Sequence, residues 1–129
     1  PLVSIVPLTV GTDDRSACRA VAEAIAGCMQ GGGLLVCAST DMTHYEPAVV
    51  AEKKDREAIE AIQALDAERL AAAVERRHIT MCGFLPVYMT LIITKILGAR
   101  SAELIDYRTS GDASGDYDRV VGYAGMIIP

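Results

Sequence analysis

Residues 34–45 read Leu34-Leu35-Val36-Cys37-Ala38-Ser39-Thr40-Asp41-Met42-Thr43-His44-Tyr45, and this stretch decides the fold that we predict. It opens with a short apolar run between a glycine cluster and a polar segment, which is typical of a strand buried in a parallel sheet. Ligands of such sheets bind at the carboxyl ends of the strands. Asp41 and His44 fall at that end, so we expect both of them in an active site.

The residues before this stretch predict the first part of a β-α-β unit. Residues 2–10 are apolar and predict a strand. Residues 14–29 are rich in Ala, Glu and Ile and predict a helix, with Thr12 or Asp13 as its N-cap. The glycines at 31–33 stop this helix. Because they precede a strand instead of following one, they do not match a phosphate-binding loop.

Three helices are predicted after this stretch. The first begins at Pro47 and carries an apolar stripe opposite a charged face. Asp66 is a good N-cap for the second helix, which ends near Arg77. Pro86 suits the first turn of the third, an apolar helix that ends at Gly98. The apolar stripe of the first helix consists of Ala58, Ile59, Ile62 and Leu65.

The last part of the chain predicts two strands, over 102–107 and 120–128, with a loop rich in Gly and Asp between them. The second of these strands is apolar at both ends, so we expect it in the centre of the sheet. Strands that alternate with helices predict an α/β fold, a layered sheet with helices on both faces. A chain of 129 residues fits one domain of this kind.

Charge and hydropathy exclude two classes of partner. The chain has a net charge of -5 and its basic residues are scattered, which argues against binding to nucleic acid or to an anionic membrane. The longest uncharged stretch, 79–94, has only 16 residues and contains Gly83 and Pro86. A membrane-spanning helix needs about 20 apolar residues, so we predict a buried helix in this stretch.

The cysteines predict a reduced protein. They form neither a CxxC pair nor a disulfide framework, and no charged leader precedes an apolar core in these residues. We therefore expect a cytoplasmic protein. Cys18, Cys28 and Cys37 are predicted to be packing residues, because free cysteine is among the most buried residue types.

Several local signatures occur in a fixed order along the chain. They read Ser39-Thr40-Asp41-Met42-Thr43-His44-Tyr45, Leu65-Asp66-Ala67-Glu68, Cys82-Gly83 with Pro86, and Thr109-Ser110-Gly111-Asp112-Ala113-Ser114-Gly115-Asp116 followed by Val120-Val121-Gly122-Tyr123-Ala124. In order and spacing they resemble the C-terminal portion of the Memo family, called AmmeMemoRadiSam system protein B in prokaryotes. The resemblance covers nearly the whole chain. It departs from the family at Thr40, where serine is usual, and around Pro86, where Phe84, Leu85 and Val87 replace the common residues.

The resemblance implies a fold related to the class III extradiol dioxygenases. It also implies a pocket in which two histidines from the N-terminal half meet a cysteine from the C-terminal half. That cysteine corresponds to Cys82, and Asp41 and His44 match the pocket's aspartate and histidine. The two N-terminal histidines have no counterpart here. We therefore expect residues 1–129 to be the C-terminal portion of a single Memo-like domain, an incomplete fold that is completed by a missing N-terminal half or by self-association.

The chemistry of these residue types supports a metal site. A thiolate with imidazole suits iron, copper or zinc, so we predict Cys82 as a metal ligand. An aspartate three residues from a histidine can orient its ring and help it to transfer protons, so His44 and Asp41 are the predicted catalytic acid/base pair.

Two functions remain open at this point. The first is a metal-dependent, dioxygenase-like oxidoreductase that acts on a small molecule. The second is a non-catalytic binding or scaffold module that keeps the shape of the pocket and binds a small molecule or a peptide.

Two other candidate sites are weaker. His78 lies four residues before Cys82 and would share a helix face with it, but Ile79-Thr80-Met81 favours an extended segment there. The loop 112–118 resembles a calcium loop, but its glycine is at the fourth position and the twelfth position is a tyrosine, not a glutamate. We predict instead that its aspartates and hydroxyls bond to the loop backbone and that its glycines adopt positive φ.

Overall fold

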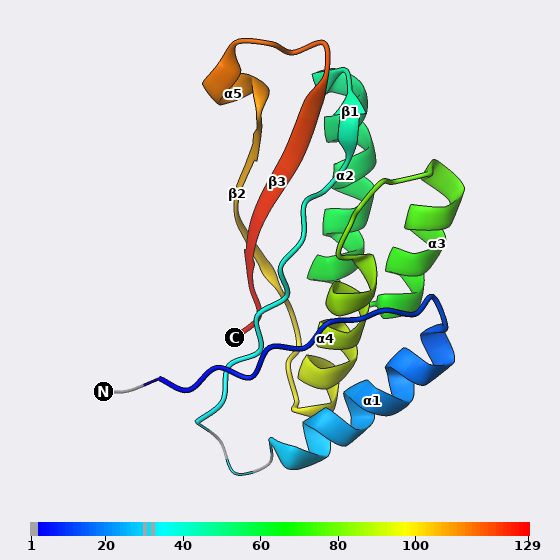
Figure 1. The fold of residues 1–129 in the computed structure, drawn as a ribbon, viewed down its shortest axis with the longest axis vertical. Coiled ribbons are helices and arrows are strands. Elements are labelled where there is room, and N and C mark those ends of the chain that lie inside the picture. The colour runs from blue at the N-terminus through cyan, green and yellow to red at the C-terminus, as the bar shows by residue number, and fades with distance from the viewer. Residues whose placement is uncertain (1–2, 30, 32) are drawn as a thin grey trace.

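The computed structural model describes residues 3–29, 31 and 33–129, which form helices packed beside a three-stranded antiparallel sheet (Figure 1). The elements are α1 (Arg15–Cys28), β1 (His44–Glu46), α2 (Ala48–Gln63), α3 (Ala67–Arg77), α4 (Phe84–Ile96), β2 (Glu103–Thr109), α5 (Gly111–Ser114) and β3 (Val120–Ile127). The α/β class predicted from the sequence is confirmed.

The strand order is β1-β3-β2, so β3 is central, as its apolar ends predict. It pairs antiparallel with both neighbours: Val121 of β3 lies opposite His44 of β1, and Ala124 of β3 lies opposite Tyr107 of β2. The predicted parallel sheet is therefore wrong for this part of the chain. The antiparallel pairing of β2 with β3 joins consecutive strands through a local connection, residues 110–119 with α5, and needs no crossover to the far end of the sheet.

The strands predicted over 2–10 and 34–40 are absent from the described residues, and so is the β-α-β unit. Leu2 and Gly32 lie outside the described residues. Most of the apolar side chains in these two segments are exposed, among them Ile5 at 83% and Leu35 at 93%. A strand needs a neighbour to pair its N–H and C=O groups, and neither segment is paired in the described chain. The expected association with another half or a second copy stays a prediction.

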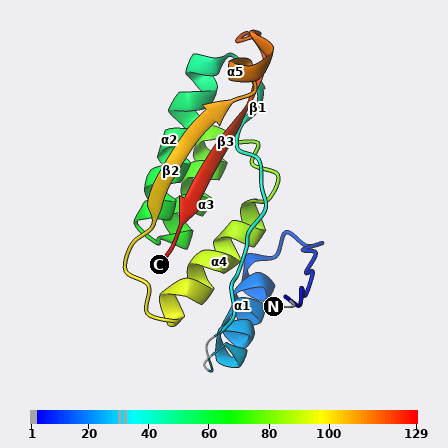
Figure 2. The same ribbon diagram turned by 90° about the vertical axis from the view of Figure 1, so that its left-hand side faces the viewer.

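The helices are arranged in layers on one side of the sheet (Figure 2). Helix α2 packs against β3, α3 and α4 lie beyond α2, and α1 packs on α4. Apart from α5 at one end of β2, no helix covers the other face of the sheet in the described part of the chain, so the prediction of helices on both faces is wrong here. None of the described helices is both long enough and apolar enough to cross a bilayer.

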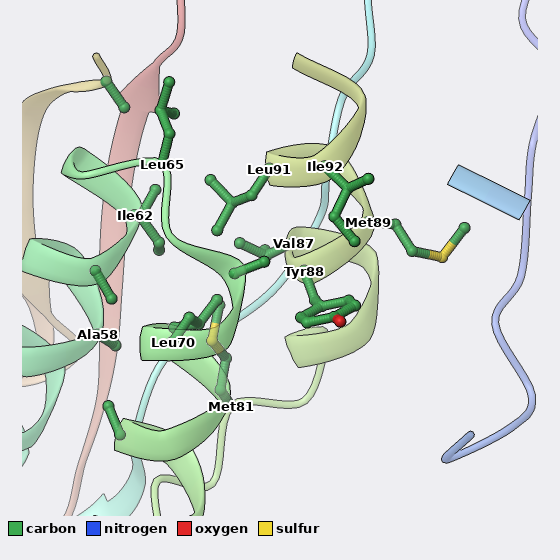
Figure 3. Packing of buried hydrophobic residues seen from close by; sticks show 14 of the residues in the cluster. Ala58, Ile62, Leu65, Leu70, Met81, Val87, Tyr88, Met89, Leu91 and Ile92 are labelled. Atoms are coloured by element: carbon green, nitrogen blue, oxygen red, sulfur yellow. The ribbon is translucent and has the colours of Figure 1, made fainter. Parts of the chain in front are cut away.

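Side chains of α2, α3 and α4 meet in one apolar core (Figure 3). The predicted stripe of α2 is buried, and Leu70 is fully enclosed between α2 and α4. The buried helix predicted in the uncharged stretch is α4, which begins at Phe84, two residues before Pro86, and buries Tyr88 almost completely. Burial of these side chains is the main stabilising term for the helical layers.

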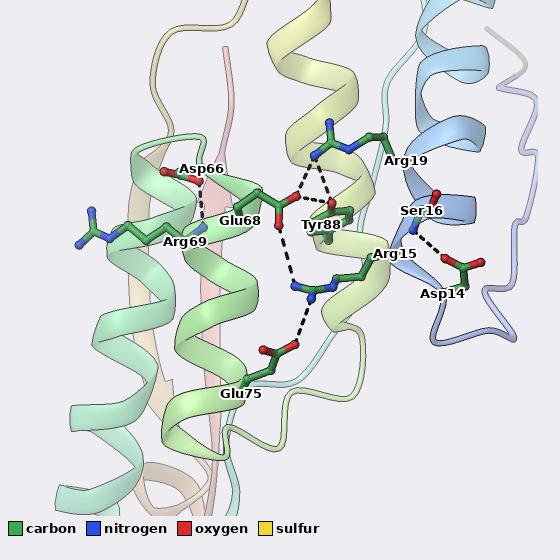
Figure 4. Close-up of polar contacts among 9 residues, drawn as sticks. All are labelled: Asp14, Arg15, Ser16, Arg19, Asp66, Glu68, Arg69, Glu75 and Tyr88. Carbon is green, nitrogen blue, oxygen red and sulfur yellow. Dashed lines mark hydrogen bonds and ion pairs between the residues drawn. The ribbon is translucent and has the colours of Figure 1, made fainter.

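Polar side chains define the helix starts and hold α1 in place (Figure 4). Asp66 caps α3 by accepting the Arg69 amide at 2.9 Å, as predicted. The N-cap of α1 is Asp14, which corrects the predicted Thr12 or Asp13; Thr12 instead accepts the N–H of Asp14.

The contact between α1, α3 and α4 centres on one carboxylate. Tyr88 and Arg19 both donate to Glu68, at 2.6 and 2.8 Å, and these bonds hold the pKa of Glu68 below its usual value. Arg15 bridges Glu68 and Glu75 on the solvent side. The network therefore joins α1 to α3 and α4 through polar side chains.

Candidate metal centre

The structure brings Asp41, His44 and Cys82 together. One donor atom from each of the three lies within 4.8 Å of the others. Asp41 and His44 come from the segment that leads into β1, and Cys82 comes from the turn before α4. The strand that was expected to end at Asp41 is not formed, so β3 and the segment before α4 position this segment instead.

Cys82 is held against the segment that carries Asp41. The amide of Asp41 donates to Cys82 Sγ at 3.3 Å, and the hydroxyl of Thr40 lies 3.8 Å from the same sulfur. Thr40 Oγ1 also accepts the N–H of Gly83 at 2.7 Å. A Cβ at Gly83 would lie 2.5 Å from the carbonyl oxygen of Ser39, so only glycine permits this close approach.

His44 is held by its backbone and by its ring. Its N–H donates to Thr80 Oγ1 at 2.7 Å, and its Nε2 lies 3.6 Å from Asp41 Oδ2. The ring is largely buried, with 20% of the side chain exposed. Its Nδ1 is buried without a hydrogen-bond partner among the described residues.

Asp55 of α2, which was not predicted from the sequence as a site residue, supports this site. Asp55 is completely buried; its Oδ1 accepts the amide of Thr43 at 2.9 Å and its Oδ2 accepts the hydroxyl of Tyr107 at 2.7 Å. Burial and this bond to a carboxylate raise the pKa of Tyr107 far above its usual value. The signal was present in the sequence, because Asp55 is an acidic residue on the apolar stripe that contains Ala58, Ile59 and Ile62.

The weaker candidate sites behave as predicted. His78 is exposed and caps α3 in the left-handed conformation, with φ 52°, so it does not share a helix face with Cys82. In the loop after β2, Asp112 accepts the amide of Thr109 at 3.0 Å, and Gly115 adopts φ 78°. These contacts satisfy the backbone of the loop.

The cysteine predictions are only partly confirmed. Cys18 is buried in the contact of α1 with α4, as expected of a packing residue. Cys28 and Cys37 are exposed, so the prediction that they pack in the core is wrong. Cys28 ends α1, and Cys37 lies in the extended segment that has no paired neighbour.

The donor set fits a transition metal. Thiolate, imidazole and carboxylate together suit zinc, iron or copper. A tetrahedral ion with ligands at 2.0–2.3 Å separates its donor atoms by roughly 3.3–3.8 Å. The Asp41–His44 separation of 3.6 Å falls in that range, and the upper limit of 4.8 Å within the group requires a side-chain movement of about 1 Å.

Comparison with known proteins identifies related sequences. A family model described as Memo-like protein matches residues 1–127. A MEMO1 family protein of Methanopyrus kandleri is 45% identical over 125 residues, covering 95% of this chain and 44% of the relative. A second, from Methanothermobacter thermautotrophicus, is 41% identical over 122 residues, covering 93% of this chain and 44% of the relative. The chain therefore spans less than half the length of these relatives.

Proposed function

The chain belongs to the Memo-like protein family, and from this premise we propose that it binds a transition metal ion through Cys82, His44 and Asp41. The observation that carries the proposal is the convergence of the three donor atoms within 4.8 Å, although Cys82 is distant in sequence from the other two.

Solvent access to the donor group favours a reactive site over a structural one. Structural zinc sites are closed by four protein ligands, whereas catalytic sites use three and keep one position for water or substrate. The described chain brings three donors together here, and Cys82 is exposed on the solvent side. We therefore propose a metal-dependent, dioxygenase-like oxidoreductase that acts on a small molecule.

Each residue has a distinct role in this proposal. Cys82 supplies a soft thiolate ligand, which favours iron, copper or zinc over magnesium or calcium. Asp41 lies beside Nε2 of His44 and orients the ring. The ring nitrogen that does not bind the ion can hold or release a proton. When bound, iron or copper supplies redox chemistry, and any of the three ions acts as a Lewis acid.

The first experiment measures metal content. The chain is purified without chelators and analysed for iron, copper and zinc, beside Cys82→Ser and the matched variant Cys28→Ser. Cys28 is an exposed cysteine at the end of α1 and outside the donor group. We expect bound metal in the wild type and in Cys28→Ser, and its loss in Cys82→Ser. Equal metal content in the two variants would remove Cys82 from the site.

The second experiment separates an enzyme from a binding module. Oxygen uptake is measured with catechol-like compounds in the metal-loaded chain and in His44→Gln. Uptake that requires both the metal and His44 supports the oxidoreductase. Metal binding without any turnover would leave the second function, a non-catalytic binding or scaffold module.

A further inference from the structure

The segment that carries His44 is clamped from two neighbouring elements. From β3, Gly122 exchanges backbone hydrogen bonds with it: Met42 N–H donates to Gly122 O and Gly122 N–H donates to Thr43 O, both at 2.9 Å. From α2, the carboxylate of Asp55 accepts the N–H of Thr43 at 2.9 Å. Thr43 therefore has both backbone polar groups fixed by residues far away in the sequence.

Asp55 is itself fixed by the sheet. Tyr107 of β2 donates to its second oxygen at 2.7 Å. Gly122 of β3 leaves the space that the carboxylate occupies, because a Cβ there would lie 2.0 Å from Asp55 Oδ2 and 3.0 Å from the Tyr107 hydroxyl. The three residues thus form one unit, which we call the Asp55 clamp.

Burial of the Asp55 carboxylate carries a cost in folding free energy. Asp55 is completely buried, and none of the ion pairs in the described chain includes it. Removing a carboxylate from water without a cation costs several kcal/mol, of the order of the penalty for one buried ion. An apolar side chain at the same point of the α2 stripe would avoid that cost but would leave the Thr43 N–H and the Tyr107 hydroxyl without this partner. The gain from Asp55 is positional, since a carboxylate can hold an amide N–H at a fixed place and an apolar group cannot.

We propose that Asp55 is a positioning residue of the metal site. The inference rests on the proposed function and deepens it. Thr43 lies directly before His44 and two residues after Asp41 in the sequence, so the bond to its amide sets the backbone from which both donors project. Without the Asp55 clamp the three donors would still be present, but the distances between them would no longer be held constant. Groups that hydrogen-bond directly to a metal ligand typically contribute 10- to 100-fold to affinity, and we expect Asp55, which acts through the backbone next to His44, to lie at the lower end of that range.

The test uses Tyr107→Phe with Tyr117→Phe as its matched control. Both tyrosines donate to an aspartate that also accepts a backbone N–H, Tyr107 to Asp55 and Tyr117 to Asp112 at 3.3 Å. The chain is titrated with Co²⁺, and binding is followed through the absorption of the cobalt–thiolate bond. We expect the dissociation constant of Tyr107→Phe to rise roughly 10-fold, and that of Tyr117→Phe to match the wild type.

The free energy of unfolding and amide hydrogen exchange distinguish a positioning role of Asp55 from a purely structural one. All variants are compared under conditions in which circular dichroism shows that they are fully folded. If Asp55 had a purely structural role, Tyr107→Phe would lower the free energy of unfolding and leave the cobalt dissociation constant unchanged. Asp55→Asn keeps one oxygen that can accept the amide of Thr43, so we expect this variant to bind Co²⁺ more tightly than Asp55→Leu does. Hydrogen exchange of the Thr43 amide is expected to be faster in Tyr107→Phe than in Tyr117→Phe.

The outcomes separate the two proposals. A wild-type chain that takes up no Co²⁺ overturns the proposed function. A wild type that binds Co²⁺ while Tyr107→Phe binds it equally well, with unchanged exchange at Thr43, overturns the role of Asp55 and leaves the metal site intact.

Discussion

Gly122→Ala tests the close packing of β3 against α2. The added Cβ would lie 2.0 Å from Asp55 Oδ2, whereas ordinary van der Waals contact begins at 3.4 Å, so the carboxylate must move by the difference, 1.4 Å. Its two hydrogen bonds, at 2.9 and 2.7 Å, do not survive a displacement of that size. Hydrogen bonds to a charged group contribute about 1.5–3 kcal/mol each, so their loss costs about 3–6 kcal/mol.

One term opposes this loss. Alanine in place of glycine reduces the freedom of the unfolded chain and stabilises the folded state by about 0.4–1 kcal/mol. The expected net destabilisation is therefore about 2–5.6 kcal/mol, a large part of the stability of a small domain. In urea unfolding followed by circular dichroism, this loss lowers the midpoint by about 1 M or more, for a slope of about 2 kcal/mol per M.

Gly125→Ala is the matched control for this prediction. It makes the same substitution in the same strand, but nothing lies within 4 Å of the added Cβ, and Gly125 is not among the glycines with positive φ. Only the entropic gain remains, so the midpoint of Gly125→Ala should stay or rise slightly. Equal midpoints for the two alanine variants would refute the claim that Asp55 is packed against Gly122 and cannot move away at low cost.

Three further predictions concern other parts of the fold. Leu70→Ala opens a cavity in the core and should lower the free energy of unfolding by about 3 kcal/mol in calorimetry; a loss below about 1 kcal/mol would contradict the tight packing of this residue. Asp66→Ala removes the cap on the Arg69 amide and should cost about 1 kcal/mol in urea unfolding, and no change would mean that the cap is not formed in solution. Tyr107 has a raised pKa in the folded state and ionises near pH 10 when the chain is unfolded. Its contribution to the free energy of unfolding is therefore complete below about pH 10 and declines above it by up to about 1.4 kcal/mol per pH unit. Tyr107→Phe should therefore lose stability less steeply than the wild type above pH 10, and identical slopes would show that the hydroxyl is not protected.

The helices could be predicted from sequence because their determinants are local. The stripe of α2 repeats at helical spacing, and Asp66 is followed at once by the residues that it caps. The shift of the α1 cap from Asp13 to Asp14 is an error of one residue, as expected where two adjacent aspartates can each serve.

The sheet could be predicted only in part because pairing is not local. The position of β3 in the centre followed from its apolar ends, but the direction of its neighbours did not. The apolar segments at 3–10 and 34–40 have the composition of strands, and composition alone does not supply a partner. Their exposed side chains, such as Leu35, mark the places where the described chain leaves strand-forming sequence unpaired.

The local part of the candidate site could also be predicted from the sequence, and the long-range part could not. The proximity of Asp41 and His44 follows from their spacing, and the 3.6 Å between their side chains agrees with it. Cys82 was connected to them only by resemblance to a family, because no spacing rule joins residues separated by 41 positions. Asp55 escaped notice because the stripe around it was interpreted as apolar, although an acidic residue in such a stripe is rarely buried without a polar partner.

The site depends on the fold through contacts that are almost all long-range. The segment from Thr40 to His44 is bound by β3, by Asp55 of α2, and by Thr80 and Cys82 before α4, yet only its last residue belongs to a strand. A segment of this kind has little conformational preference of its own, so its geometry persists only while those three elements remain packed together. A substitution such as Gly122→Ala, which touches none of the three donors, can therefore change how they face one another. Stability and site geometry in this chain are coupled through the contact of α2 with β3.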